Sequence, residues 1–411
     1  MSHPGILERF LHYVSMDTQS SDQSDSFPST AKQVNLANRL KQELEELGLT
    51  DVVVNQWGYL LASLETNLSK KVPTIALLAH LDTSPDVSGA NVKPLIHRAY
   101  DGRDIVLSKK AGVVLKVSEN PYLKEQIGKT LITSDGTTLL GADDKAGIAA
   151  IMDAVTFLQA NPHHPRPNLR IIFTPDEETG RGVEHLSMEE VKADYGYTVD
   201  GERLGEIEDE TFCADSVELR LKGINVHPGM AKNKLVNAVK VAAAVIAELP
   251  GNAQSPETTE KRQGYLHPHQ VSGNVEEVLI KFLIRDFTVP GLATKENLLR
   301  RITKRVMSRF PRAEYDFKII ESYRNMKVVL DKHPEVMSKA KQAITLSGIK
   351  PKRASIRGGT DGARLCFMGL PTPNLFSGGN NFHSKLEWVA LEDMQKASLV
   401  LVNLLKLWAE Q

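Results

Sequence analysis

Cysteine is scarce in this sequence: Cys213 and Cys366 are the only two among 411 residues. They are too few for a disulfide framework, and neither belongs to a CxxC or Cys-His spacing that would ligate a metal. No apolar run reaches the ~18 residues that a membrane span requires, and the N-terminal segment lacks a charged stretch followed by an apolar signal core. We therefore expect a cytoplasmic protein that does not enter a membrane.

The sequence also lacks an excess of either charge. The 50 lysines and arginines face 51 aspartates and glutamates, for a net charge of −1. This balance predicts no binding to nucleic acid or to an anionic membrane surface. The hydrophobic fraction of 41% is ordinary for a globular protein, and 411 residues exceed what one core usually supports. Two domains are therefore expected.

Helices and strands alternate over the first half of the chain. Apolar residues at helical spacing predict a helix over residues 6–14 and another over 34–44, which Ser29 and Thr30 could cap. Further apolar runs predict the strands 52–54, 72–81, 169–173 and 197–199 and the helix 144–158. Such alternation favours a parallel sheet covered by helices.

The pattern changes after about residue 211. We expect a strand with one exposed face at residues 216–221 and helices at 235–249 and 298–306. Residues 250–264 are expected to form a polar loop, and residues 276–287 a pair of antiparallel strand halves. From residue 354 the α/β pattern returns. The fold prediction is an α/β domain of residues 1–211 and 326–411, with a mixed, mostly parallel sheet covered by helices, interrupted by an inserted α+β domain of residues 212–325.

Histidines and carboxylates gather in five short motifs, each next to the end of an expected strand. The motifs are His80-Leu81-Asp82, Gly141-Ala142-Asp143-Asp144-Lys145, Pro175-Asp176-Glu177-Glu178, Val199-Asp200 and Asn381-Phe382-His383. Each alone has an ordinary explanation: a buried ion pair for the first, a helix N-cap for the second, an exposed acidic loop for the third. Together they supply the ligands of a pair of zinc ions, and indicate a two-metal hydrolase.

The residue types suggest a division of roles. Asp82 follows His80 by two positions on one strand face and can orient the imidazole. Asp143 lies between small neighbours and could bridge two metals, and one of the two adjacent glutamates could be a ligand while the other acts as general base. The three charges of Asp143, Glu178 and Asp200, with a bridging hydroxide, balance the four positive charges of two Zn²⁺.

At these motifs the chain strongly resembles the peptidase T family, the tripeptide aminopeptidase branch of a zinc superfamily that also holds aminoacylases and glutamate carboxypeptidases. The resemblance covers nearly the whole chain. It is carried by residues 10–19, 80–86, 139–147, 174–180, 197–201, 225–229, 284–287, 356–363 and 378–383.

The resemblance implies a role for each residue of the metal site. His80, Asp143 and Asp200 would hold one zinc ion, and Asp143, Glu178 and His383 the other. Asp82 would be the catalytic acid that orients His80, and Glu177 the proton acceptor. The chain would thus carry two Zn²⁺, with residues 1–211 and 326–411 as the catalytic domain.

The resemblance also makes residues 212–325 a lid domain, through which some relatives dimerise. His227 would stabilise the oxyanion, and Arg285 and Arg357 would lie near the substrate. From the residues alone, His227 could be a turn residue and Arg285 could pair with Asp286. An arginine beside glycines, as at position 357, suits a bidentate hold on a carboxylate. The half-exposed lid sheet could pair across a two-fold axis into a homodimer.

The function expected is that of a zinc aminopeptidase that releases the N-terminal residue of short peptides, tripeptides in particular, with Glu177 as the base. A related deacylase or dipeptidase on the same scaffold is the alternative, whereas a non-catalytic peptide-binding protein would not need every ligand and the base. The chain departs from the family at Leu386, where histidine is frequent, and at Ser384, where glycine is common. Neither is a ligand position, so these departures concern the shape of the pocket.

Overall fold

The computed structural model describes residues 4–410, which form two compact units. The first unit runs to Asp209 and also includes Val328–Ala354 and the residues from Thr360 onward. The second unit is Glu210–Lys327 together with Ser355–Gly359. The short segment Ser355–Gly359 therefore lies with the second unit, which differs from the sequence-based boundary. Every helix among the described residues is too short or too polar to cross a lipid bilayer.

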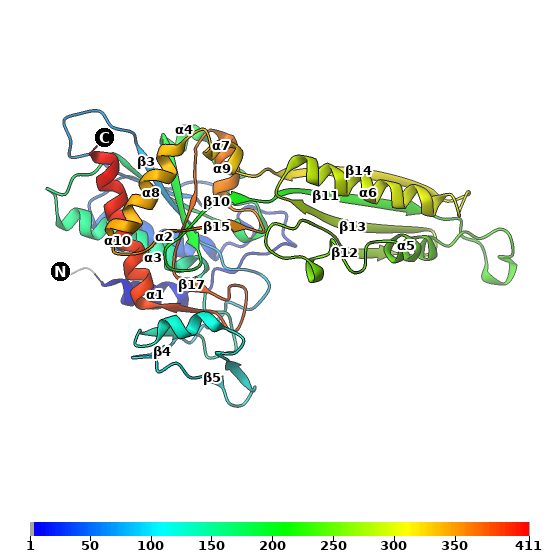
Figure 1. The fold of residues 1–411 in the computed structure, drawn as a ribbon, viewed down its shortest axis with the longest axis horizontal. Helices are drawn as coiled ribbons and strands as arrows, with labels where there is room; N and C mark the ends of the chain where they lie inside the picture. The colour runs from blue at the N-terminus through cyan, green and yellow to red at the C-terminus, as the bar shows by residue number, and fades with distance from the viewer. Residues whose placement is uncertain (1–3, 411) are drawn as a thin grey trace. The chain divides into compact units, whose positions relative to one another are not determined.

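The centre of the first unit is a mixed sheet of eight strands (Figure 1). Its four central strands run parallel, and antiparallel strands flank them, as the sequence predicts. From edge to edge the order is β1 (Thr50–Val54), β2 (Leu60–Leu64), β8 (Leu169–Thr174), β3 (Ile75–His80), β9 (Tyr195–Gly201), β16 (Asn374–Phe376), β10 (Glu206–Thr211) and β15 (Lys352–Ile356). Strands β3 and β8 are buried throughout because helices cover the sheet.

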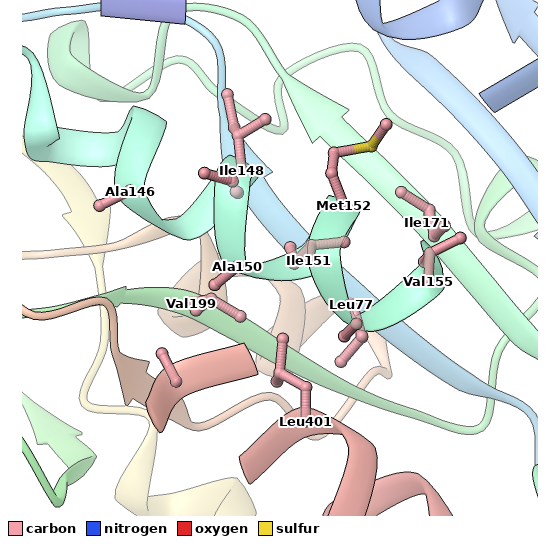
Figure 2. Close-up of a cluster of buried hydrophobic side chains, with 14 of the residues drawn as sticks. Leu77, Ala146, Ile148, Ala150, Ile151, Met152, Val155, Ile171, Val199 and Leu401 are labelled. Atoms are coloured by element: carbon pink, nitrogen blue, oxygen red, sulfur yellow. The ribbon is translucent and has the colours of Figure 1, made fainter. Parts of the chain in front are cut away.

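Helix α3 (Ala142–Ala160) is mostly buried and packs between the sheet and helix α10 (Leu391–Ala409). Figure 2 shows its apolar side chains against Leu77, Ile171, Val199 and Leu401. The approach to β9 is so close that a Cβ on Gly147 would lie 1.9 Å from the carbonyl oxygen of Val199. The helices of this unit are α1 (Ile6–Ser15), α2 (Gln33–Glu46), α3 (Ala142–Ala160), α4 (Met188–Val191), α8 (Pro334–Leu346), α9 (Asp361–Met368) and α10 (Leu391–Ala409), with α7 (Lys327–Leu330) at the boundary.

Two smaller sheets complete the first unit. One has the order β17 (Gly379–Asn380), β18 (Trp388–Ala390), β7 (Leu131–Thr133) and β4 (Leu95–His97). The other pairs β5 (Ile105–Ser108) with β6 (Val113–Leu115). Strands β17 and β18 are antiparallel, so residues 381–387 form the loop of a hairpin.

The second unit is an antiparallel four-stranded sheet with helices α5 (Ala238–Ala247) and α6 (Val289–Met307) packed against it. The strand order is β12 (Tyr265–Gly273), β13 (Glu277–Asp286), β11 (Cys213–Lys222) and β14 (Glu314–Tyr323). Buried and partly exposed residues alternate along β11 and β13, which confirms the predicted α+β character. The predicted pair of strand halves at residues 276–287 is wrong: β13 is one strand that pairs with both β11 and β12.

The predicted cap of α2 is also wrong. The helix begins at Gln33, and no side chain caps its first turn. Ser29 instead donates its main-chain N–H and its hydroxyl to the buried carboxylate of Asp176. A buried carboxylate needs donors more than an exposed helix end does, so tertiary structure overrides the local capping preference.

Candidate metal centre and active site

His80 is the last residue of β3, and its side chain is only 2% exposed. Its Nδ1 lies 3.0 Å from the main-chain carbonyl oxygen of Asp82. Because a carbonyl only accepts, Nδ1 carries a proton and donates it. Nε2 then faces carboxylate oxygens of Asp143 and Asp200, at 2.9 and 3.6 Å. An imidazole held in this way is arranged as a metal ligand.

The carboxylate of Asp82 binds the acidic turn and also lies near the imidazole. Its Oδ1 lies 3.4 Å from Nδ1 of His80, farther than the Asp82 carbonyl does. The two carboxylate oxygens accept the main-chain N–H groups of Glu177, at 3.0 Å, and Glu178, at 3.2 Å. Asp82 therefore fixes His80 through its main chain and both glutamates through its side chain.

A second carboxylate holds the same turn from the other side. Asp176 has a φ of 57°, and the one-turn helix Glu177–Thr179 follows it. Its carboxylate accepts hydrogen bonds from Ser29 and from Nε2 of Gln33, the latter at 2.7 Å, while its main-chain N–H donates to Oε1 of Gln33 at 3.0 Å. The position of the glutamate pair is thus set by contacts from α2 and from the end of β3.

Asp143 and Asp144 have separate tasks at the start of α3, where both have non-helical backbone angles. Asp143 places Oδ1 2.9 Å from Nε2 of His80 and Oδ2 3.2 Å from Nε2 of His383. Asp144 accepts the main-chain N–H groups of Gly147 and His80, each at 3.2 Å. The capping interpretation therefore fits Asp144, whereas the carboxylate of Asp143 lies between two imidazoles.

His383 lies in the hairpin loop between β17 and β18. Its Nε2 is 2.8 Å from Oε2 of Glu178, and its Nδ1 is 3.2 Å from Oδ2 of Asp86. The other oxygen of Glu178, Oε1, is buried and has no hydrogen-bond partner among the described residues. Asp200, on β9, completes the cluster and donates its main-chain N–H to Asn374.

The structure thus brings the predicted ligands of the first unit together. Two sets of donor atoms lie within 4.8 Å of one another: His80, Asp143 and Glu178, and His80, Asp144 and Asp200. In the second set Asp144 is already bonded to main-chain N–H groups, so its neighbour Asp143 is the better donor. Glu177 and Asp82 lie at the same edge of the sheet because the carboxyl ends of parallel strands meet there.

Burial and charge crowding shift the pKa values of these groups. Burial and, to a smaller extent, the charge of Asp143 raise the pKa of Glu178 to about 8 and that of Asp200 to about 6. Burial lowers the pKa of His383, but hydrogen bonds to Asp143 and Glu178 outweigh it and raise the value to about 11. Burial also raises the pKa of Glu177 well above its ordinary value. The shifts reflect carboxylates that are crowded together in a buried site, where a positive charge between their oxygens would be stabilising.

The three residues predicted to contact substrate all lie in the second unit. His227 is exposed, and its Nδ1 accepts the main-chain N–H of Gly229 at 3.2 Å. Arg285 donates to the carbonyls of Asp215 and Ile284 rather than pairing with Asp286, which binds Lys295.

Arg357 is tied to the polar loop that precedes β12. Its guanidinium donates to the carbonyl oxygens of Thr259, Lys261 and Gln263 and to the Thr259 hydroxyl, at 2.8 to 3.3 Å. It also lies over the rings of Phe212 and Tyr265. Every one of these contacts is within the second unit.

Sequence reasoning missed Glu387 and the contact of Asp86 with His383. Glu387 is fully buried and accepts three main-chain N–H groups at the start of α3. No local pattern marks these contacts, because 244 residues separate Glu387 from Asp143 and 297 separate Asp86 from His383. Leu386, where the chain departs from the family, packs against the apolar cluster around Tyr122 and Trp388.

Comparison with known proteins places this site in a family. The sequence pattern of "Peptidase family M20/M25/M40" matches residues 135–407. Peptidase T of Caldanaerobacter subterraneus subsp. tengcongensis is 46% identical over 406 residues, which cover 99% of each chain. Two solved structures share the fold: the aminopeptidase PepT of Bacillus cereus (TM-score 0.75, 23% identity) and a tripeptidase of Staphylococcus aureus (TM-score 0.77, 22% identity), each matched over 99% of this chain and 98% of the other. The chain is therefore an enzyme of peptidase family M20/M25/M40 and belongs to its peptidase T branch.

Proposed function

We propose that the first unit binds two Zn²⁺ ions at adjacent positions. One ion would be held by His80, Asp143 and Asp200, and the other by Asp143, Glu178 and His383. The observation that carries this proposal is the carboxylate of Asp143, whose two oxygens face two different imidazoles. A carboxylate in that position can serve as a ligand to both ions at once.

The donor set fits two cations. The imidazoles of His80 and His383 and the carboxylates of Asp143, Glu178 and Asp200 converge, and the buried Oε1 of Glu178 has no partner among the described residues. Nitrogen and oxygen donors of this kind suit zinc, and the three carboxylate charges nearly balance two divalent ions. When bound, such a pair of ions polarises a scissile carbonyl and lowers the pKa of water.

Glu177 is the proposed general base. Its main-chain N–H is fixed by Asp82, and burial raises the pKa of its side chain, so the carboxyl group holds a proton well once it has one. Glu177 would accept the proton of the attacking water and pass it to the leaving amine. Asp82 acts by positioning both His80 and this glutamate.

The proposed substrates are short peptides with a free N-terminus, tripeptides in particular. The names of the similar proteins, peptidase T, aminopeptidase and tripeptidase, support this choice. The test is a digest of tri-alanine by zinc-loaded protein, beside di-alanine and N-acetyl-alanine. Free alanine and di-alanine from the tripeptide alone would support the proposal. Cleavage of N-acetyl-alanine or di-alanine instead would move the chain to the deacylase or dipeptidase branch.

From the resemblance alone, we also propose that the second unit is the lid, and that His227, Arg285 and Arg357 contact the substrate. Alanine variants of these residues test this role, which requires a raised KM or a reduced kcat with zinc binding unchanged. Homodimerisation through the lid is likewise a proposal, and a monomer by light scattering would refute it.

A further inference from the structure

Glu387 places a fully buried carboxylate against the main chain that carries Asp143. Oε2 accepts the N–H groups of Leu140 and Gly141 at 2.7 and 2.8 Å, and Oε1 accepts the N–H of Asp143 itself at 3.0 Å. The side chain of Glu387 is not exposed at all. Three main-chain donors satisfy this buried carboxylate, and the loss of any one of these hydrogen bonds would leave a buried polar group unsatisfied.

The same hairpin loop contacts Asp143 twice. At one end of the loop, Nε2 of His383 lies 3.2 Å from Oδ2 of Asp143. At the other end, Glu387 binds the main-chain N–H of the same aspartate. Between them, the Ser384 hydroxyl accepts the N–H of Leu386 at 3.0 Å, and the Ser384 carbonyl accepts the N–H of Glu387 at 3.2 Å. The loop is therefore internally braced and joins the side chain of Asp143 to its backbone.

The main chain that Glu387 binds does not have helical backbone angles. Gly141 has a φ of 85°, and Asp143 has φ −84° and ψ 103°, so neither continues the helix. Main-chain N–H groups ahead of a helix have no partner inside it, and they attract a negative charge. Glu387 supplies the acceptor oxygens for these groups and keeps Asp143 in the extended conformation that points its carboxylate between His80 and His383.

We propose that Glu387 is a positioning residue for the bridging carboxylate: by binding the main chain of Leu140, Gly141 and Asp143, it sets where Asp143 stands between the two metal positions. The inference rests on the proposed two-zinc function. Glu387 is fully buried against these main-chain groups and is not one of the proposed zinc ligands, so its effect is exerted through Asp143.

The experiment compares the zinc affinity of Glu387→Gln with that of a matched control, Glu392→Gln. Glu392 also accepts a main-chain N–H with its carboxylate, that of Thr130 at 2.9 and 3.1 Å, but it does not bind a ligand-bearing segment. In Glu387→Gln, an amide NH₂ replaces one acceptor and faces an N–H donor. Zinc would be titrated into metal-free protein in competition with a chromophoric chelator. We expect about 10–100-fold weaker binding for Glu387→Gln and unchanged binding for the control.

A second measurement separates positioning from general damage to the fold. At saturating zinc, Glu387→Gln should lose kcat while KM stays within about twofold, because the substrate contacts are intact and only the bridging carboxylate is displaced. If Glu387→Gln does not fold, Glu387→Asp, which keeps the charge but shifts both oxygens by one methylene, takes its place with the same expected direction. If the wild type binds zinc and the Glu387 variant binds it with equal affinity, this inference is overturned and the proposed function stands. Wild-type protein that binds no zinc would overturn the proposed function and this inference with it.

Discussion

Ser29 donates both its main-chain N–H and its hydroxyl to the carboxylate of Asp176, at 2.6 and 2.5 Å, across 147 residues of sequence. Asp176 directly precedes Glu177, the proposed base. A segment ahead of the second helix therefore helps to fix the turn that carries the proposed base.

Replacing Ser29 by alanine should cost about 1–3 kcal/mol of stability, since it removes one donor from a buried carboxylate. Urea unfolding would measure the loss. Ser26→Ala is the control, because Ser26 is exposed and its change should stay within about 0.5 kcal/mol. Equal stability of the two variants would show that the contact with Asp176 contributes nothing net.

Glu177→Ala should retain its zinc and lose about 10²–10⁴-fold in kcat, the usual share of general acid–base catalysis. Metal analysis and tri-alanine hydrolysis would be measured on the same sample. Glu184→Gln alters a nearby exposed acid that pairs with Arg181, and it should leave turnover unchanged. Near-normal activity of Glu177→Ala would remove this residue from the role of base.

Removing zinc with a chelator should lower the unfolding temperature, and adding zinc back should restore it. At a free metal concentration a hundred times Kd, binding to the native state contributes about 2.7 kcal/mol per site. His383→Ala should bind one zinc ion where the wild type binds two, whereas His97→Ala, which changes a histidine hydrogen-bonded to Thr133, should still bind two. A His383→Ala variant with full zinc content would contradict the proposed ligand set.

Cysteine reactivity gives a pH-dependent test of the fold. Burial raises the pKa of the Cys366 thiol to about 12 and also raises that of Cys213. The reactive species is the thiolate, so a raised pKa means less of it at any given pH between 8 and 11. A disulfide reagent should therefore react slowly with the native protein over this range and rapidly with both thiols in urea. Fast labelling of native protein at pH 8 would show that the two sites are more open than the structure has them.

Arg357→Ala should loosen the loop that the guanidinium binds. Trypsin is expected to cut after Lys261 and Arg262 several times faster in this variant than in the wild type, because three carbonyl contacts are lost. Arg300→Ala, which removes a guanidinium stacked on Phe317, should leave the cleavage rate unchanged. If Arg357→Ala raises KM without changing proteolysis, substrate binding is its main role.

The sequence predicted the type and order of most elements, because buried strands and amphipathic helices leave a periodic apolar pattern. It also predicted which groups of the first unit meet: His80, Asp143, Glu178, Asp200 and His383 come together as expected. The failures have a common physical origin. The local pattern predicts a cap at Ser29 and gives no sign of Glu387, because both residues bind partners more than 140 residues away. Such contacts leave no trace in a local pattern.

The contacts of Asp82 go beyond those that its spacing from His80 predicts. Its carboxylate lies 3.4 Å from Nδ1 of His80, but the Asp82 carbonyl oxygen is nearer, and the carboxylate also accepts two main-chain N–H groups. A sequence shows which side chains share a strand face, but it does not show where unpaired N–H groups of a distant turn will lie.

The hairpin loop that bears His383 and Glu387 has a consequence for how this peptidase is made in the cell. Both residues are synthesised some 240 residues after their partner Asp143. A chain that stops before this loop has the first imidazole and most of the carboxylates, yet it lacks the segment that completes the proposed metal centre. Hydrolytic activity should therefore arise only after this loop has been synthesised and has packed against Asp143.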